Sequence, residues 1–442
     1  MFATQARIAW LLLASTGYLF AQDLVPKSSP QANPVVLTNA VLHTMSGSVL
    51  VGGTLWFLDG VIRGVLAEGL KPDLPPRSEP IVIDLKGKHV FPGMISAHTT
   101  LGLVEISSVR QTVDTDELGE MSPEAFAAVA VNPDSAAIPV ARSNGILAAG
   151  VFPIGGLMPG RASVMQLDGW TNKDLTVKAN AGPIIAWPQQ IVIDVSRWPL
   201  LRPDTGAENT KKARKSIDDA FTAAQAWLEA HTADPKVPLD IRHEALVQAL
   251  RGEVPVFLLA EDLEQIESAV LWATGRKLRP VIVGGRAAGQ CASLLRDRHV
   301  PVIIDGIHRL PQRDDSAYDE SFTLPKRLFD QGVMFCIATG MDFSTDRNLP
   351  YHAATAAAFG LDREVAMLAV TLRAAEILSV SDRLGSLSVG KDATLFVADG
   401  HPFDLPTVIE LAFVRGQKVD LRNKQTELAQ KYRERYRQMS GR

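Results

Sequence analysis

The feature that most constrains the fold is a regular alternation of short apolar segments with amphipathic segments between residues 254 and 378. The apolar segments are short and rich in β-branched residues, as buried strands are. The segments between them have apolar positions at helical spacing. This alternation predicts parallel pairing of the strands and an α/β barrel or open sheet. The expected strands are Val254 to Leu259, Pro280 to Val283, Val300 to Asp305 and Val333 to Ala338, with further candidates at Ile146 to Ile154, Ala162 to Leu167 and Pro183 to Trp187.

Short strands without helices flank this region on both sides. Thr54 to Leu58 and Val61 to Val65 enclose Asp59-Gly60, a strong signal for a tight hairpin. At the other end, residues 383–397 read RLGSLSVGKDATLFV, and residues 412–419 read AFVRGQKV with a turn at Gly416. The last segment, Lys424 to Met439, has apolar residues at helical spacing, and we expect an amphipathic helix docked on the body.

The stretch that joins the first flank to the alternating region carries the most specific motif. Residues 87–105 read GKHVFPGMISAHTTLGLVE. This stretch resembles the opening barrel strand of the amidohydrolase superfamily, P-G-x-I-D-x-H-x-H, and residues 383–397 resemble the closing segment of that family. Alternate residues of a strand point to the same face, so an H-x-H pair aims two imidazoles at one metal ion. Here His98 takes the first position, whereas Thr100 takes the second and Ser96 takes the position of the acid.

The resemblance implies the fold and its division into domains. It implies an α/β protein with a TIM-like (β/α) barrel beside a small composite β-sandwich built from both flanks. The expected parts are a signal peptide (1–21), the two sandwich segments (22–90 and 383–421), the barrel (91–382) and a C-terminal helix (422–442).

The resemblance also implies metal ligands at the ends of several barrel strands. Residues 255–262 correspond to the family's strand five and have Leu259 where a histidine is expected, and residues 280–286 correspond to strand six and have Gly284 there. Residues 336–342 correspond to strand eight and offer Asp342. Ser344 or Asp346 would fit if the register of that irregular segment differs. His98 and Asp342 are therefore the candidate metal ligands, with Asp342 also the catalytic proton carrier. So few ligands predict either one weakly held divalent metal, zinc in substoichiometric amount, or none.

Three further residues are candidates for substrate binding. Arg161 follows a Gly-rich loop and Arg286 follows strand six, so both are expected at the barrel mouth, where two arginines suit a carboxylate. His308 lies in a loop after another strand and would add a ligand if it folds over the mouth. The expected partner is a small-molecule substrate or ligand, and a homo-oligomer is compatible with the sequence.

The composition and the N-terminal residues indicate where in or outside the cell the protein is expected. Residues 1–21 contain Arg7 followed by a short apolar run that ends at Ala21, which predicts a cleavable signal, a mature start near Gln22 and a periplasmic or secreted protein. No later segment is apolar for long enough to span a membrane. A net charge of -4 gives no indication of nucleic-acid binding. The chain has two cysteines, Cys291 and Cys336, and their spacing leaves open whether they pair.

Two functions remain open at this point. The first is an exported hydrolase of C–N bonds other than peptide bonds, similar to imidazolonepropionase-like and dipeptidase-like enzymes, that uses a metal-activated water. The second is a non-catalytic relative that keeps the barrel as a binding or scaffold protein. Under the second hypothesis, Thr100→His alone restores no hydrolysis, because the strand-five and strand-six ligands are still missing.

Overall fold

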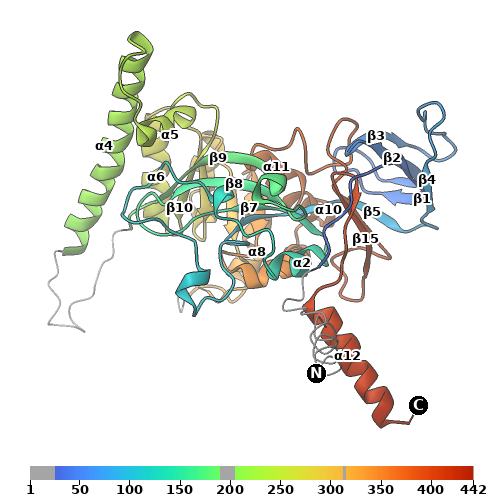
Figure 1. The fold of residues 1–442 in the computed structure, drawn as a ribbon. Helices are drawn as coiled ribbons and strands as arrows, with labels where there is room; N and C mark the ends of the chain where they lie inside the picture. The colour runs from blue at the N-terminus through green and yellow to red at the C-terminus, as the bar shows by residue number, and fades with distance from the viewer. Residues whose placement is uncertain (1–24, 190–204, 312–314, 442) are drawn as a thin grey trace, which may run out of the picture.

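The computed structural model describes residues 25–189, 205–311 and 315–441, and its strands form two eight-stranded sheets that lie side by side (Figure 1). The predicted signal peptide lies outside the described residues. One sheet is built from the two ends of the chain, and the other from its middle. The second sheet carries the candidate site, and the first lies beside the second (Figure 1).

The first sheet joins both flanks. Its strand order is β16-β15-β14-β5-β1-β2-β3, with β4 paired to β1. The flanks meet where β14 pairs antiparallel with β5, placing Phe396 opposite Phe91. The hairpin expected at Asp59-Gly60 is confirmed: both residues have positive φ, as the tight turn between β2 and β3 requires. This is one mixed sheet, and a two-layered sandwich stays a prediction. The strands are β1 (Val35–Leu42), β2 (Leu50–Leu58), β3 (Val61–Leu66), β4 (Ile81–Asp84), β5 (His89–Pro92), β14 (Leu395–Ala398), β15 (Ile409–Val414) and β16 (Gln417–Lys418).

The second sheet runs in chain order from β6 to β13. Neighbouring strands are parallel except at β8, which is antiparallel to both β7 and β9. The prediction of parallel pairing throughout is wrong at this strand, because the chain turns back directly after β7 with no helix between. The strands are β6 (Met94–Thr99), β7 (Ile146–Val151), β8 (Gly160–Gln166), β9 (Thr176–Ala186), β10 (Val256–Ala260), β11 (Pro280–Gly284), β12 (Val302–Asp305) and β13 (Phe335–Ala338).

The sheet curls until its two edge strands, β6 and β13, pack against each other. Among the described residues no strand ladder joins them, so the sheet is an almost closed barrel. Its interior is filled by apolar side chains from strands all around the ring, including Ile95, Phe257, Val281 and Cys336. Both cysteines are buried and free, so they do not pair.

Helices pack on the outside of this barrel. Helix α6 lies against β10 and β11, α8 and α9 lie against β13, and α5 lies against β9. Short 3-10 turns extend or connect several of them. The helices and turns are η1 (Arg110–Thr112), η2 (Ala127–Val129), α2 (Ala137–Arg142), α3 (Asn172–Leu175), α4 (Thr205–Ala233), α5 (Ile241–Leu250), α6 (Leu263–Gly275), η3 (Ala288–Gln290), α7 (Ala292–Asp297), α8 (Glu320–Asp330), η4 (Phe343–Asn348), α9 (Leu349–Ala358), α10 (Arg363–Ala369), α11 (Leu372–Ile377) and α12 (Lys424–Met439).

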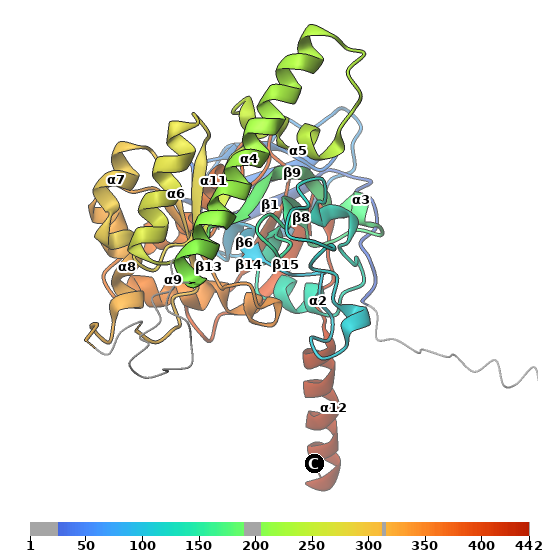
Figure 2. The ribbon, with the colours of Figure 1, turned by 90° about the vertical axis from the view of Figure 1, so that its left-hand side faces the viewer.

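Two helices extend beyond the body. Helix α4 runs past the barrel at one end, and α12 projects away from both sheets (Figures 1 and 2). The helix expected at Lys424 to Met439 is present. The prediction that it docks on the body is wrong, because none of its residues is buried. Among the described residues, no helix has both the length and the apolar character needed to cross a membrane.

Candidate active site

A cavity of about 460 Å³ opens where the strands of the barrel end. Its wall contains the last residues of β9, β10, β11 and β12 and a residue that follows β13. In α/β barrels the reacting groups are carried at this carboxyl end of the strands. The polar side chains of the wall include His98, Glu261, Arg286 and Asp305.

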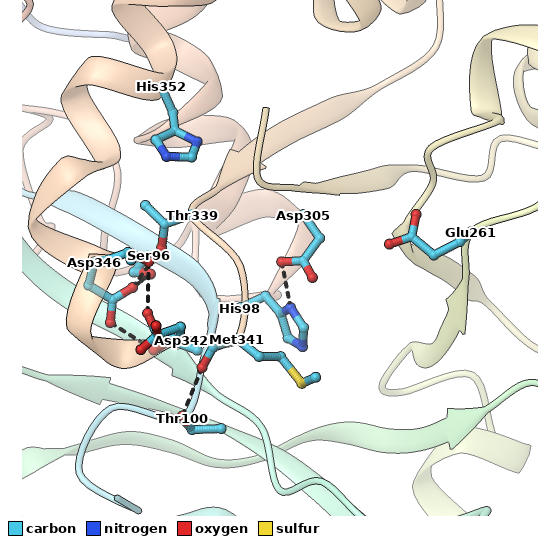
Figure 3. Close-up of polar contacts among 12 residues, drawn as sticks. Ser96, His98, Thr100, Glu261, Asp305, Thr339, Met341, Asp342, Asp346 and His352 are labelled. Atoms are coloured by element: carbon cyan, nitrogen blue, oxygen red, sulfur yellow. Dashed lines mark hydrogen bonds and ion pairs between the residues drawn. The ribbon is translucent and has the colours of Figure 1, made fainter. Parts of the chain in front are cut away.

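His98 and Asp305 form a hydrogen-bonded pair across the barrel. The His98 Nδ1 atom lies 2.9 Å from a carboxylate oxygen of Asp305, which ends β12 (Figure 3). Burial alone would raise the pKa of Asp305. The hydrogen bond and charge of His98, together with the charge of Arg309, outweigh this effect and hold the pKa below its usual range. An ionised carboxylate only accepts hydrogen bonds, so Nδ1 of His98 carries the proton and donates. The lone pair of a neutral His98 is then on Nε2.

Nε2 of His98 has no hydrogen-bond partner among the described residues, although it is buried and its residue lines the cavity. The ring of His98 also packs against the ring of Phe152. Their centroids are 4.7 Å apart and their planes are almost perpendicular. Position and tautomer are therefore both set, and the unpartnered nitrogen is available to a molecule in the cavity. This is the arrangement of a histidine that accepts a proton with a carboxylate behind it.

Glu261 occupies the space that a strand-six ligand would need. It follows β10, and its carboxylate lies over the backbone of Gly284, where a Cβ atom would come within 2.8 Å of the carboxyl carbon. The backbone N–H of Arg286 donates to the same carboxylate at 3.0 Å. Burial raises the pKa of Glu261, and the Asp305 carboxylate adds to this, against the opposing effect of Arg309.

Two arginines surround this carboxylate. Nη1 of Arg309 lies 3.5 Å from Glu261 and donates to the backbone oxygen of Asp305 at 3.2 Å. The buried Nε atoms of Arg286 and Arg309 have no hydrogen-bond partner within the described ranges. The cavity wall therefore combines one acceptor nitrogen with the cationic side chain of Arg286, which suits a ligand that carries a carbonyl or carboxylate group.

The expected metal positions serve another purpose. The hydroxyl of Thr100 donates to the backbone oxygen of Met341 at 2.8 Å, and the hydroxyl of Ser96 donates to Asp346 at 2.6 Å. Asp346 also accepts a hydrogen bond from Thr339 at 2.9 Å (Figure 3). It accepts another from Thr99 at 2.7 Å. These contacts join β6 to the chain after β13. We call Ser96, Thr99, Thr339 and Asp346 the seam cluster, because they close the barrel where its edge strands have no ladder.

The donor set does not fit the metal that the sequence motif implies. Catalytic zinc normally has three protein ligands and a water. In the described part of the chain no group of three or more His, Cys, Asp or Glu side chains is placed to hold a metal ion. The hydroxyl of Thr100 is engaged in the barrel closure, and Leu259 and Gly284 offer no donor atom.

The other candidate residues lie apart from the cavity wall. Asp342 is exposed and accepts a hydrogen bond from the backbone N–H of Ser344 as the cap of η4, so the buried carboxylate of this segment is Asp346. Arg161 points to a different cavity, beside α5, where its Nη2 atom donates to the backbone oxygen of Glu124. The structure therefore does not bring Arg161 and Arg286 together.

His308 also faces away from the cavity. Its Nε2 atom lies 2.8 Å from the hydroxyl of Thr355 on α9, and its ring packs against that of His352 at 4.0 Å between centroids. Burial lowers the pKa of His308, so it is neutral at pH 7. It does not line the cavity that holds His98.

Asp305 and Arg309 are the residues that sequence reasoning missed. The sequence places Asp305 at the end of an expected strand, and a carboxylate at the carboxyl end of a barrel strand is the signal that points to it. Arg309 gave none, because its contact with Glu261 joins two loops far apart in sequence.

Comparison with known proteins bears on the fold of the chain. No family model matches the chain. The amidohydrolase tasK of Hapsidospora irregularis is 20% identical over 429 residues, covering 83% of this chain but only 42% of that protein. The chain thus spans less than half the length of this curated relative. Among solved structures, an amidohydrolase from Thermotoga maritima MSB8 superimposes with a TM-score of 0.76 at 24% identity, covering 88% of this chain and 100% of the other.

The chain has the amidohydrolase fold. The resemblance predicted from residues 87–105 and 383–397 is thereby confirmed. Two further solved structures are similar at lower scores. Molinate hydrolase has a TM-score of 0.55 at 14% identity, covering 90% of this chain and 96% of the other. A putative prolidase from Bifidobacterium longum has a TM-score of 0.52 at 19% identity, covering 88% of this chain and 95% of the other.

Proposed function

We propose that this protein is an exported hydrolase that cleaves a C–N bond of a small molecule in the cavity at the carboxyl end of a TIM-like barrel. The observation that carries the proposal is the unpartnered Nε2 of His98, held in the cavity wall by Asp305. Amidohydrolases of similar fold support the reaction class. Export is proposed on the N-terminal sequence, and the division into barrel and composite β domain on the flank motifs.

In the proposed reaction His98 is the general base. A water molecule beside Nε2 gives a proton to the imidazole as its oxygen attacks the carbonyl carbon of the substrate. Asp305, ionised and hydrogen-bonded to Nδ1, stabilises the imidazolium that forms. Arg286 in the cavity wall is placed to stabilise the negative charge that develops on the carbonyl oxygen. The protonated His98 then passes its proton to the leaving nitrogen, which completes the cleavage.

The test is hydrolysis of N-acyl amino acids, dipeptides and lactams by the purified full chain after treatment with a chelator. We expect activity that survives the chelator and that His98→Gln lowers by roughly 10²- to 10⁴-fold. Asp342→Asn is the matched control, because this carboxylate caps η4 outside the cavity wall.

Two results would contradict the proposal. Hydrolysis that needs added zinc and fails in Asp342→Asn would restore the ordinary metal-dependent mechanism. Saturable binding of these compounds without turnover would favour the second hypothesis, a binding protein, which the replacement of metal positions by Thr100, Leu259 and Gly284 supports.

A further inference from the structure

Helix α12 presents an apolar face that nothing in the described structure covers. Its large apolar residues are separated by four, four and three positions, which places them on one face of a helix. Their exposed fractions increase from 40% at the first to 72% at the last. These residues are Leu428, Tyr432, Tyr436 and Met439.

Charged residues are ordered around this face. Lys424 and Lys431 lie one turn before and after Leu428, and Arg435 lies one turn after Tyr432, so these three flank the apolar face on one side. Arg433 flanks it on the other side, whereas Arg437 lies farther round the helix and pairs with Glu434 at 2.7 Å. The two acidic residues, Glu427 and Glu434, are seven positions apart and therefore share a line on the opposite, polar face.

This order of charges has a direct physical meaning. Basic side chains at both borders of an apolar face reach anionic headgroups while the face lies among the acyl chains, and acidic side chains opposite stay in water. Tyrosine, with an apolar ring and a polar hydroxyl, favours that boundary. A partner helix would need basic and acidic residues on facing sides, whereas here both borders have the same sign.

The helix is also placed to meet a flat surface. It projects clear of the body in both views (Figures 1 and 2). Its first turn is fixed by a capping box between Asn423 and Thr426, and Asn423 donates a hydrogen bond to Ser143. With 16 residues it is about 24 Å long. It is therefore suited to lie on a membrane surface.

We propose that α12 binds the surface of an anionic lipid membrane, with Leu428, Tyr432, Tyr436 and Met439 inserted at the headgroup boundary and the flanking Lys and Arg residues on the lipid phosphates. The proposal is independent of the hydrolase function, since α12 contributes no residue to the cavity wall.

The test is co-sedimentation of the full chain with vesicles of equal parts phosphatidylglycerol and phosphatidylcholine, and with vesicles of phosphatidylcholine alone. We expect binding to the anionic vesicles that weakens as salt is raised. The triple variant Lys431→Gln, Arg433→Gln and Arg435→Gln should lose roughly tenfold or more in affinity, because each basic residue near an anionic surface contributes to binding. The variant Tyr432→Ser with Tyr436→Ser should also bind less.

A control variant has the same change in charge on the other projecting helix. It replaces Lys211, Lys212 and Lys215 of α4 by Gln, and it should bind as the unchanged chain does. Residues 1–24 are the same in every variant, so any contribution from them cancels in the comparison. Circular dichroism should show every variant folded, because α12 has no buried residue.

Three outcomes would overturn the proposal. The first is equal binding to both kinds of vesicle, and the second is unchanged binding by the α12 variants. The third is no vesicle binding together with a dimer that the two tyrosine substitutions dissociate. That result would assign the apolar face to a second copy of the chain.

Discussion

Two carboxylates, Asp346 and Asp305, lie near the same end of the barrel and have opposite surroundings. Asp346 is fully buried and accepts hydrogen bonds from three hydroxyl groups of the seam cluster. Asp305 is bonded to His98, whose second nitrogen faces the cavity without a partner in the described structure. The hydrogen-bonding capacity of the first carboxylate is used within the fold. The second carboxylate fixes a group that is still available to a ligand.

This contrast explains the departures from the metal-binding motif. Ser96 and Thr100 belong to the closure between β6 and the segment after β13, so an acid and a histidine at these positions would break contacts that hold the barrel together. Gly284 instead leaves room for the Glu261 carboxylate.

The largest effect is expected from Asp346→Ala. Removing this carboxylate leaves three buried hydroxyls without their acceptor at the point where the barrel has no ladder. Each unpaired buried polar group costs about 1–3 kcal/mol, so the free energy of unfolding should fall by roughly 3 kcal/mol or more. Urea denaturation followed by circular dichroism measures this change.

Asp305→Asn is the matched control on the cavity side. Its amide oxygen can still accept from Nδ1 of His98, so the unfolding free energy should fall by only about 1 kcal/mol, while hydrolysis falls strongly. Equal destabilisation by the two substitutions would show that the seam cluster and the cavity pair do not differ in role.

A smaller effect is expected in the pH dependence of stability. Burial raises the pKa of Asp346 from 3.8 to about 6, against the opposing effect of its three hydroxyl partners. The folded protein therefore binds this proton more tightly than the unfolded chain. The resulting stabilisation is complete below pH 3.8 and is lost as the pH rises through about 6, with a magnitude on the order of 2–3 kcal/mol.

Asp346→Asn isolates this contribution. His43 and His401, whose pKa values burial lowers to about 4, act in the opposite direction, since their stabilising effect is lost as the pH falls from 6.5 toward 4. The contributions of the two histidines are the same in the unchanged chain and in Asp346→Asn, so they cancel when the two unfolding free energies are subtracted. The unfolding free energy of the unchanged chain, relative to the variant, should decrease between pH 4 and 7. A constant difference would contradict a raised pKa at this carboxylate.

The fold was more predictable than the site, and the reason is local. The Asp59-Gly60 hairpin and the alternating strands have signals within a few residues, and the two flank motifs pair as expected through Phe91 and Phe396. His98 could be found because it belongs to a motif. The sequence cannot distinguish Asp342 from Asp346, because strand register does not fix which residue of an irregular segment turns inward. The partnership of His98 with Asp305 joins residues 207 positions apart, and only the closed barrel brings them together.

The sharpest test of the cavity side, with the smallest expected effect on activity, is Gly284→Ala. Gly284 has a φ of +102°, so any L residue there is strained by about 1–2 kcal/mol. Gly390→Ala is the matched control, because its φ of +91° gives similar strain and a Cβ there meets no atom within 4 Å. At Gly284 the new methyl group also displaces Glu261 and breaks its bond to the N–H of Arg286. Both variants should therefore lose similar stability in urea denaturation, while only Gly284→Ala should lower hydrolysis or ligand binding, by several-fold. If the two variants keep equal activity, the Glu261 carboxylate has no part in the cavity's chemistry, and the contrast with the seam reduces to His98 and Asp305 alone.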